Sequence, residues 1–281
     1  LNKMEEMLLS GDELREKAKE LRKMLLTMIY KAQSGHPGGS LSATDIVASL
    51  YFHTLRVDPK NPKWEDRDRF VLSKGHVCPV LYSALIMRGF ISEDTIGTLR
   101  KQGSILQGHP DMKRCPGIEI STGSLGQGIS CAVGMAIAGK MDEKEYRVYT
   151  LLGDGECDEG QVWEAAQAAN KYQLDNLTVI IDNNGLQNDG FAKDIMPTLD
   201  LRAKFEAFGF QAVRIDGHNV DEITAALDFM KTQKNGKPKC IVCNTVKGKG
   251  VSFMENVAIW HGLAPNDEQY AQAMEDVEEG F

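Results

Sequence analysis

The sequence has little that would place the protein in a membrane, on nucleic acid or outside the cell. No apolar run reaches the roughly 18 residues that a transmembrane helix needs, and the first 24 residues are charged throughout, unlike a signal peptide. The net charge of −8 argues against general nucleic-acid binding, which needs basic surface. Repeats, low-complexity tracts and long linkers are also missing. We therefore expect a soluble, cytoplasmic protein with no membrane and no nucleic acid among its partners.

Cysteine is scarce and scattered, with six residues along the chain, which fits a reducing compartment. Cys240 and Cys243 have the spacing of a redox or zinc pair. However, their segment, KPKCIVCNTV, has the pattern of a buried strand, and no second cysteine pair follows. We expect both cysteines to be structural.

The pattern of apolar residues predicts an α/β fold. Helical spacing covers residues 12–33, 42–54, 79–88, 92–101, 126–140, 161–172, 201–208, 220–231 and 267–278. Five short β-rich runs lie between these ranges: RFVLS, YRVYTLLG, NLTVIID, FQAVRID and KCIVCNTV. Nearly continuous apolar strands that alternate with helices indicate a central, mostly parallel sheet with helices on both faces.

Every predicted strand ends in glycine beside a polar or ionisable residue. Gly-Asp-Gly follows YRVYTLL and Asn-Asn-Gly follows LTVIID, while KGH, GHN and KGKG follow the other three. Ligands of parallel sheets bind beyond the carboxyl ends of the strands. One such end is ordinary turn chemistry. Five together predict a polar ligand that the backbone approaches closely.

The stretch LLGDGECDEG predicts a metal and diphosphate site around Asp154. A carboxylate cannot face phosphate directly, but a divalent cation such as Mg²⁺ between them removes the repulsion. At the next strand end, Asn184 and a free backbone carbonyl around Leu186 can supply further oxygen ligands. A helix predicted to start after Asp154 could turn its N-terminus toward phosphate. Gly-Asp-Gly alone is a common turn, and so is Asn-Asn-Gly. The two motifs separated by one helix and one strand are a more specific signal for a metal and diphosphate site.

This combination resembles the thiamin diphosphate signature. Further segments are similar to the transketolase family, in the family's order: SGHPGG (34–39), LSKGH (72–76), QGHPD (107–111), STGSLGQGIS (121–130) and WHGLAP (260–265). The resemblance covers nearly the whole chain, but only the N-terminal, diphosphate-binding region of a full-length transketolase. It implies the thiamin diphosphate-binding fold, as a single domain over residues 1–281.

The resemblance also implies roles for particular residues. It implies thiamin diphosphate with Mg²⁺, or Ca²⁺ or Mn²⁺, and metal ligation by Asp154, Asn184 and the backbone of Leu186. The implied cofactor contacts are His76, Gly123, Ser124, Leu125, Gly155, Glu159, Asn184 and His261. The implied catalytic residues are His36, His109 and His261, a residue type that exchanges protons near neutral pH. His53 and His218 lie outside these assignments, and we expect them to be structural.

Two features depart from the family pattern. This chain has GSLGQG where full-length members have GPLGQG, a mild change because backbone N–H groups make the contact. The pyrimidine-binding and C-terminal domains are absent, and with them the glutamate that contacts the aminopyrimidine and the arginines that bind substrate phosphate. The resemblance therefore predicts the N-terminal subunit of a split transketolase, inactive without a C-terminal subunit that carries both domains, in an α2β2 heterotetramer.

The implied reaction transfers a two-carbon ketol unit between sugar phosphates, for example from xylulose 5-phosphate to ribose 5-phosphate, as in the pentose phosphate pathway. One alternative is a related thiamin diphosphate enzyme, either similar to deoxyxylulose-phosphate synthase or specific for an unusual pentulose. Another is a non-catalytic or regulatory subunit that has kept the fold. A nucleotide-binding oxidoreductase is disfavoured, because no GxGxxG opens a helix after a first strand.

Overall fold

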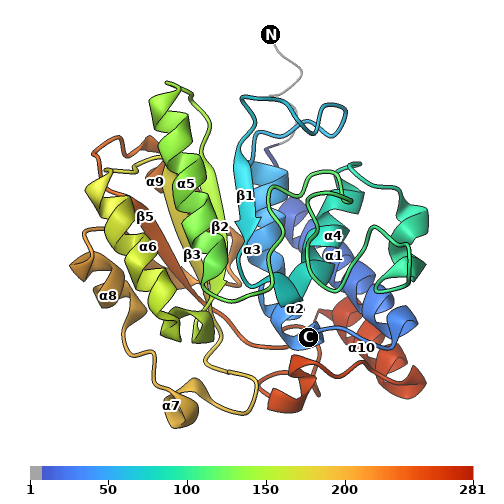
Figure 1. Ribbon diagram of the computed structural model, residues 1–281. Helices are drawn as coiled ribbons and strands as arrows, with labels where there is room; N and C mark the ends of the chain where they lie inside the picture. Colours follow the sequence, from blue (N-terminus) through green and yellow to red (C-terminus); the bar gives the residue numbers. More distant parts are fainter. Residues whose placement is uncertain (1–7, 281) are drawn as a thin grey trace.

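A five-stranded parallel sheet forms the centre of the computed structural model, which describes residues 8–280 (Figure 1). The strands are β1 (Arg69–Leu72), β2 (Val148–Gly153), β3 (Leu177–Asn183), β4 (Gln211–Asp216) and β5 (Lys239–Asn244). Their order is β1-β2-β3-β5-β4, and every neighbouring pair is parallel. All five predicted strands are present, so the predicted α/β fold is confirmed.

The helices fall close to the predicted ranges. They are α1 (Gly11–Ala32), α2 (Pro37–Ser42), α3 (Thr44–Ser49), α4 (Cys78–Met87), α5 (Gln127–Met141), α6 (Gly160–Lys171), α7 (Ala192–Ile195), α8 (Leu201–Ala207), α9 (Val220–Thr232) and α10 (Asp267–Glu279). Short 3₁₀ helices span Gly75–Val77, Glu93–Thr98, Gly155–Asp158 and Ala258–His261, and a π-helical turn, Leu50–Thr54, follows α3. Within residues 8–280, no helix is long and apolar enough to cross a membrane.

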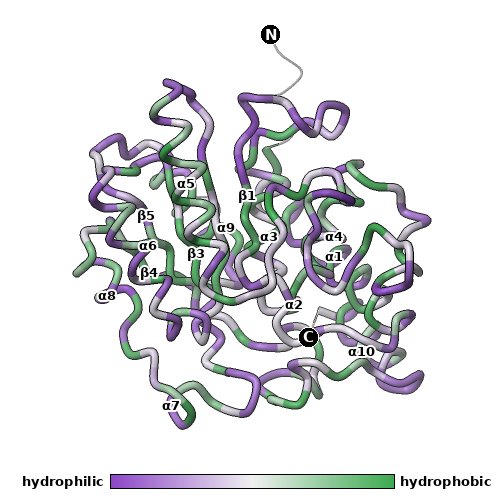
Figure 2. Tube along the Cα trace, viewed as in Figure 1, coloured by the Kyte–Doolittle hydropathy of each residue, from purple (hydrophilic) through white to green (hydrophobic). Residues whose placement is uncertain are grey.

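Helices cover both faces of the sheet. One core packs α1, α3, α4, α9 and α10 against strand residues such as Leu151, Ile180 and Ile241. The other core packs α5, α6 and α8 against Leu152 and Ile181. In Figure 1, α5, α6 and α8 gather on the left and α1, α4 and α10 on the right. Because successive residues of the inner strands face opposite cores, β2, β3 and β5 are buried almost throughout. The edge strand β4 is only partly buried and carries Gln211, Arg214 and Asp216. Figure 2 colours the chain by hydropathy.

Cys240 and Cys243 belong to opposite cores. Both lie on β5 and are fully buried, Cys240 against the α5, α6 and α8 layer and Cys243 against the α1 layer. Burial raises the pKa of both thiols. Residues three apart on a strand face opposite ways, so this pair cannot close on one metal or one disulfide. The geometry supports the structural interpretation.

Two predicted helices differ from the structure. Residues 92–101 form only the 3₁₀ helix Glu93–Thr98, because the hydroxyls of Thr95 and Thr98 bond to carbonyls three residues back, which competes with an α-helical ladder. After Asp154 comes the 3₁₀ helix Gly155–Asp158, and α6 begins only at Gly160. The expected α-helical N-terminus therefore lies at Gly160 rather than next to Asp154.

Candidate active site

The carboxyl ends of β2, β3 and β5 lie side by side in the middle of the sheet. Asp154 directly follows β2, Asn184 directly follows β3, and Lys247 lies three residues beyond β5. Segments from both ends of the chain reach the same edge: Gly248 N–H donates to the Gly38 carbonyl at 2.9 Å. The predicted metal ligands and a lysine thus converge where parallel sheets bind their ligands.

Asp154 joins two of these strand ends. Its carboxylate accepts the backbone N–H of Gly155 at 2.8 Å and that of Gly185 at 2.6 Å, and its side chain is buried. Burial, followed by the charge of Asp182, raises the pKa of Asp154 to about 6. A buried carboxylate with a raised pKa is stabilised by a cation at its free lone pairs. The residue is therefore suited to hold a metal ion.

Asn184 and Leu186 present further oxygens beside Asp154. Asn184 Oδ1 accepts the Leu186 N–H at 3.1 Å, and its amide donates to Ser42 Oγ at 3.4 Å. The Leu186 carbonyl is not free, contrary to expectation, because Lys247 Nζ donates to it at 3.3 Å and to the Gln187 carbonyl at 3.2 Å. The three oxygens form a hard donor set, which fits Mg²⁺ or Ca²⁺. They are the Asp154 carboxylate, the Asn184 amide oxygen and the Leu186 carbonyl, which already attracts the Lys247 ammonium.

A buried ion pair supports this edge of the sheet. Lys74 Nζ donates to Asp182 Oδ2 at 2.6 Å, and both side chains are almost fully buried. Asp182 also accepts hydrogen bonds from Ser42 and Thr245. Burial alone would raise the pKa of Asp182, but Lys74 and these hydroxyls hold it below its ordinary value. The sequence motif LSKGH contains Lys74, but its role was missed because a lysine is usually a solvated surface residue.

Glu156 connects the Gly-Asp-Gly turn to the GSL segment (Gly123–Leu125). Its carboxylate accepts hydrogen bonds from Gly126 N–H at 2.9 Å, Ser73 Oγ at 2.5 Å and Gly153 N–H at 3.1 Å. The sequence motifs assigned roles only to its neighbours Asp154 and Glu159. Glu156 thus holds together two backbone segments that were predicted to contact the cofactor.

Close packing at Gly75 fixes the other side of the GSL segment. A Cβ atom on Gly75 would lie 2.7 Å from Thr122 Oγ1 and 3.0 Å from Gly123 N. Thr122 Oγ1 donates to the Leu72 carbonyl at 2.7 Å, which ties the segment to the end of β1. Only glycine at position 75 allows this approach.

The predicted contacts around the GSL segment lie together. A cavity of about 370 Å³ is lined by His109, Gly123 and Ser124, among others. Glu159 is the N-cap residue of α6, and its Cβ would lie 2.8 Å from a Cβ placed on Gly126. A second cavity, of about 560 Å³, is lined by Asn184, Gly185 and residues around α7. Helix α7 lies at the bottom of the view in Figure 1.

Three of the four predicted site histidines form a cluster. The ring centroids of His36 and His76 are 5.2 Å apart, those of His36 and His261 5.4 Å, and those of His76 and His261 5.3 Å. His109 lies beside this cluster, with its ring against Gly123. His36 precedes α2, His76 lies in the 3₁₀ helix Gly75–Val77, and His261 ends the 3₁₀ helix Ala258–His261. Distant segments therefore meet at one point.

The clustered histidines are neutral at pH 7. Burial, followed by the charge of Arg100, lowers the pKa of His36 to about 4. Burial, followed by the charge of Lys247, lowers the pKa of His261 to about 3, and burial also lowers the pKa of His76. A neutral imidazole carries one donor and one acceptor, so these rings can hydrogen-bond hydroxyl or carbonyl oxygens of a sugar.

Lys247 links the metal ligands to the histidines, although no sequence motif gave it a role. Its ammonium lies 2.8 Å from His261 Nδ1 in addition to contacting the Leu186 carbonyl. Burial, followed by the charge of Lys74, lowers its pKa to about 8. The only signal in the sequence was its place in KGKG at the end of the last strand.

The two remaining histidines make structural contacts. His218 Nδ1 lies 2.7 Å from Asp45 Oδ2, and its Nε2 accepts the Val246 N–H at 2.8 Å. His53 bonds to the Leu9 carbonyl at 2.8 Å and to Asp228 at 3.0 Å. Both bridge neighbouring segments, as a structural role requires.

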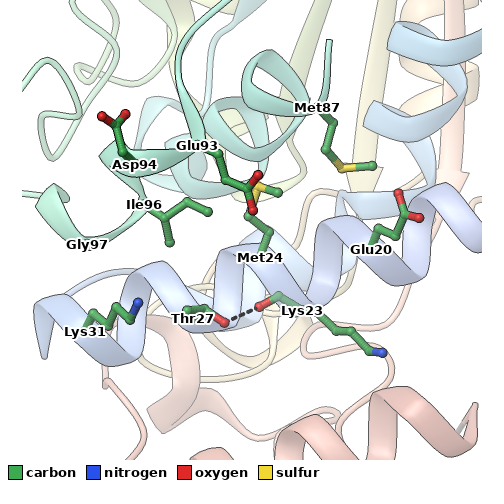
Figure 3. A pocket seen from close by; sticks show the side chains of 10 residues that line it. All are labelled: Glu20, Lys23, Met24, Thr27, Lys31, Met87, Glu93, Asp94, Ile96 and Gly97. Atoms are coloured by element: carbon green, nitrogen blue, oxygen red, sulfur yellow. Dashed lines mark hydrogen bonds between the residues drawn. The ribbon is translucent and has the colours of Figure 1, made fainter. Parts of the chain in front are cut away.

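A groove of about 670 Å³ lies elsewhere, between α1, the end of α4 and the 3₁₀ helix Glu93–Thr98 (Figure 3). Its lining is Glu20, Lys23, Met24, Thr27, Lys31, Met87, Glu93, Asp94, Ile96 and Gly97. Among the described residues, none of the predicted site residues lines it, so the histidine cluster and the strand ends remain the candidate site.

Comparison with known proteins identifies a family. Residues 14–278 match the family described as "Transketolase, thiamine diphosphate binding domain". The chain is 46% identical over 266 residues to the 6-deoxy-6-sulfo-D-fructose transketolase subunit SqwG of Clostridium sp., covering 95% of this chain and 96% of that protein. It is 46% identical over 261 residues to one of the subunits of the apulose-4-phosphate transketolase of Phocaeicola vulgatus, covering 92% and 91% respectively.

Longer transketolases also match, but over part of their length. The crystal structure of transketolase from Campylobacter jejuni superimposes with a TM-score of 0.91 at 36% identity, covering 96% of this chain and 43% of that one. Human transketolase is 43% identical over 251 residues, which is 39% of its length. This chain therefore spans less than half the length of these two proteins but nearly all of the two relatives above.

Proposed function

We propose, from the premise that this chain belongs to the transketolase family as a thiamine diphosphate-binding domain, that it is one subunit of a two-chain, ketol-transferring enzyme. The observation that carries the proposal is the meeting of Asp154, Asn184 and the Leu186 carbonyl with a cluster of neutral histidines at one edge of the sheet. Near-complete coverage of relatives that are themselves named as subunits supports the split arrangement.

We assign the cofactor contacts as follows. Asp154, Asn184 and the Leu186 carbonyl hold Mg²⁺, or Ca²⁺ or Mn²⁺, and the metal neutralises the diphosphate. The backbone and side chains that contact thiamine diphosphate are those of His76, Gly123, Ser124, Leu125, Gly155, Glu159, Asn184 and His261. When bound, thiamine diphosphate supplies the carbanion chemistry of the reaction. The buried Lys74–Asp182 pair and Glu156 keep the backbone segments of this site in register.

The histidines act on the sugar. His36 and His261 are half-buried, neutral and adjacent, so they can bind the oxygens of the ketose and stabilise charge that develops there. His109, which lines the cavity beside the GSL segment, contacts a more distant part of the sugar.

The partner completes the enzyme. We propose that a second subunit carries the pyrimidine-binding and C-terminal domains, and that two copies of each chain form an α2β2 assembly in the cytoplasm. Without that subunit, the glutamate that contacts the aminopyrimidine is missing, so this chain alone is inactive. The single-domain assignment of residues 1–281 belongs to the same proposal; residues 1–7 and 281 lie outside the described part of the chain.

The substrates are anionic sugars. Xylulose 5-phosphate and ribose 5-phosphate are one candidate pair. The relatives named for 6-deoxy-6-sulfo-D-fructose and apulose 4-phosphate favour a second candidate, a less common ketose that ends in a sulfonate or phosphate group. The net charge of −8 does not attract such sugars, so local groups of the assembled site must bind the anionic end.

Ketol transfer by the assembled pair tests the proposal. Each ketose (xylulose 5-phosphate, apulose 4-phosphate and 6-deoxy-6-sulfo-D-fructose) is offered with an aldose phosphate acceptor to this chain, its co-expressed partner or both, with and without cofactor and Mg²⁺. We expect turnover only with both chains and cofactor. Asp154→Asn should abolish it, whereas Asp158→Asn, in the same loop but exposed, should not. Stable assembly with bound cofactor but no transfer from any ketose would refute the proposed activity.

A further inference from the structure

The guanidinium of Arg100 lies against the histidine cluster. Its Nη2 is 3.3 Å from His36 Nδ1, and its Nη1 donates to Ser34 Oγ at 2.9 Å. A Cβ placed on Gly108 would lie 3.2 Å from Arg100 Nε and 3.3 Å from Cζ, so the guanidinium also packs on the backbone just before His109. Three contacts thus hold the group in one orientation.

The backbone at Arg100 is held in an uncommon conformation. Its φ is +61°, in the left-handed region that costs a non-glycine residue roughly 1 kcal/mol or more. The Arg100 N–H donates to the Leu106 carbonyl at 2.8 Å, which closes the loop between the 3₁₀ helix and the QGHPD motif. This conformation directs the side chain toward Ser34 and His36.

The chemistry of the contact determines the proton position on His36. A guanidinium has only N–H donors and stays protonated in proteins, so it can bond to His36 only if Nδ1 offers a lone pair. A neutral imidazole carries one N–H, which must then be on Nε2. Lys247 has the same relation to His261, because its ammonium donors face Nδ1 at 2.8 Å.

We propose that Arg100 is a positioning residue that holds His36 as the Nε2–H tautomer, so that His36 donates a hydrogen bond to a substrate oxygen and does not act as a general base. The tautomer follows from the geometry alone, and the role toward substrate rests on the proposed function. Burial and the neighbouring cations, which disfavour the imidazolium, keep a single proton on the ring at pH 7.

NMR of the imidazole nitrogens tests the tautomer without any turnover. In this chain labelled with ¹⁵N-histidine, two-bond ¹H–¹⁵N correlations distinguish Nε2–H from Nδ1–H, and His36→Gln identifies the His36 signals. We expect His36 to be entirely Nε2–H in the unmodified chain and a mixture in Arg100→Met. Arg100→Lys, which keeps a donor, should retain mainly Nε2–H. Lys101→Met, which removes a neighbouring exposed cation, is the matched control and should change nothing.

Two outcomes would overturn the proposal: an Nδ1–H signal for His36 in the unmodified chain, or an unchanged tautomer in a folded Arg100→Met. If Arg100→Met fails to fold, Ser34→Ala, which removes the partner of Nη1, should still give a partial shift of the tautomer. An unchanged spectrum in that variant would equally overturn it.

Kinetics of the two-chain assembly tests the role toward substrate. Arg100→Met should lower kcat by about tenfold, with little change in the affinity for thiamine diphosphate. This is less than the roughly 10²–10⁴-fold that a proton-transferring group contributes, because the variant misplaces the donor without removing it. His36→Gln, whose amide can place an N–H near the Nε2 position, should retain more activity than His36→Ala. A change in substrate KM alone, with kcat intact, would instead make Arg100 an anion-binding residue and refute the positioning role. Absence of turnover in the unmodified assembly would refute the proposed function but leave the NMR result standing.

Discussion

Replacing Asp154 with asparagine should stabilise the metal-free protein while destroying its metal site. The Asp154 carboxylate is buried, and its pKa is raised from 3.8 to about 6. The folded protein therefore holds this proton more tightly than the unfolded chain does. The stability gained from this tighter proton binding is fully present below pH 3.8 and is lost as the pH rises through about 6. Above that pH, without metal, the buried charge opposes folding.

The magnitude follows from the raised pKa. At about 1.4 kcal/mol per pH unit, the charged carboxylate costs about 3 kcal/mol at pH 8. Asparagine removes this cost but has one carbonyl oxygen for the two N–H groups, of Gly155 and Gly185, that the carboxylate accepts. Losing one of these bonds costs about 1 kcal/mol. The net gain of about 2 kcal/mol should raise the melting temperature by about 4 °C for a chain of this size.

Thermal unfolding in EDTA measures this difference. The melting temperature of Asp154→Asn should exceed that of the unmodified chain at pH 8, and the gap should narrow toward pH 5. Adding Mg²⁺ and thiamine diphosphate should stabilise the unmodified chain and leave the variant unchanged. Asp158→Asn, which removes an exposed carboxylate from the same loop, should respond to ligands like the unmodified chain. An Asp154→Asn protein that is less stable than the unmodified chain in EDTA at pH 8 would refute the reasoning.

Three further perturbations test other parts of the site. Lys74→Met leaves the Asp182 carboxylate buried without its ammonium partner, so urea unfolding should show a loss of about 3–5 kcal/mol in the free energy of unfolding. Adding Asp182→Asn should recover part of this loss. Unchanged stability of Lys74→Met would contradict the role of this pair. Gly75→Ala places a methyl group within 2.7 Å of Thr122 Oγ1, so calorimetric titration should show the affinity for thiamine diphosphate reduced about tenfold or more. Gly134→Ala, whose added methyl group has no atom within 4 Å, should bind the cofactor normally. Equal affinities of the two variants would count against the packing argument. The pKa of His36, about 4, lies below the ordinary 6.5, so the contribution of His36 to stability is present above pH 6.5 and is lost as the pH falls toward 4. His36→Gln should flatten the plot of unfolding free energy against pH between these values. An unaltered slope in that range would show that His36 does not titrate there.

The sheet could be predicted from the sequence because its signal is local. The inner strands, which are buried on both faces, are nearly continuous apolar runs. The partly exposed edge strand β4 was located by the β-rich run FQAVRID between two helical patterns. Helix prediction failed at residues 92–101, where threonine hydroxyls bond to nearby carbonyls and the apolar spacing gave no sign of it. The range of α6 was predicted to within one residue, as 161–172, but the 3₁₀ turn that separates α6 from Asp154 was not predicted.

The motifs named residues that the structure brings together, whose roles stay predictions, and they gave no sign of residues placed by distant pairing. The histidines His36, His76 and His261 meet as the motifs implied. Lys74 and its partner Asp182 lie 108 positions apart, and nothing local distinguishes this lysine from a solvated one. Arg100 was overlooked likewise, because its conformation depends on Leu106 and its contacts on Ser34 and His36. Charged residues whose positions depend on tertiary contacts leave little trace in composition or periodicity.

The histidine cluster has a consequence for biosynthesis. His36 and His261 are separated by 225 positions, yet their rings are 5.4 Å apart. During translation at roughly 5–20 residues per second, His36 is synthesised about 10–45 s before His261. No nascent chain can therefore form the cluster, or capture cofactor through it, before synthesis has reached His261. Contact of free cofactor with the complete cluster is therefore confined to the final stage of synthesis and the time after it.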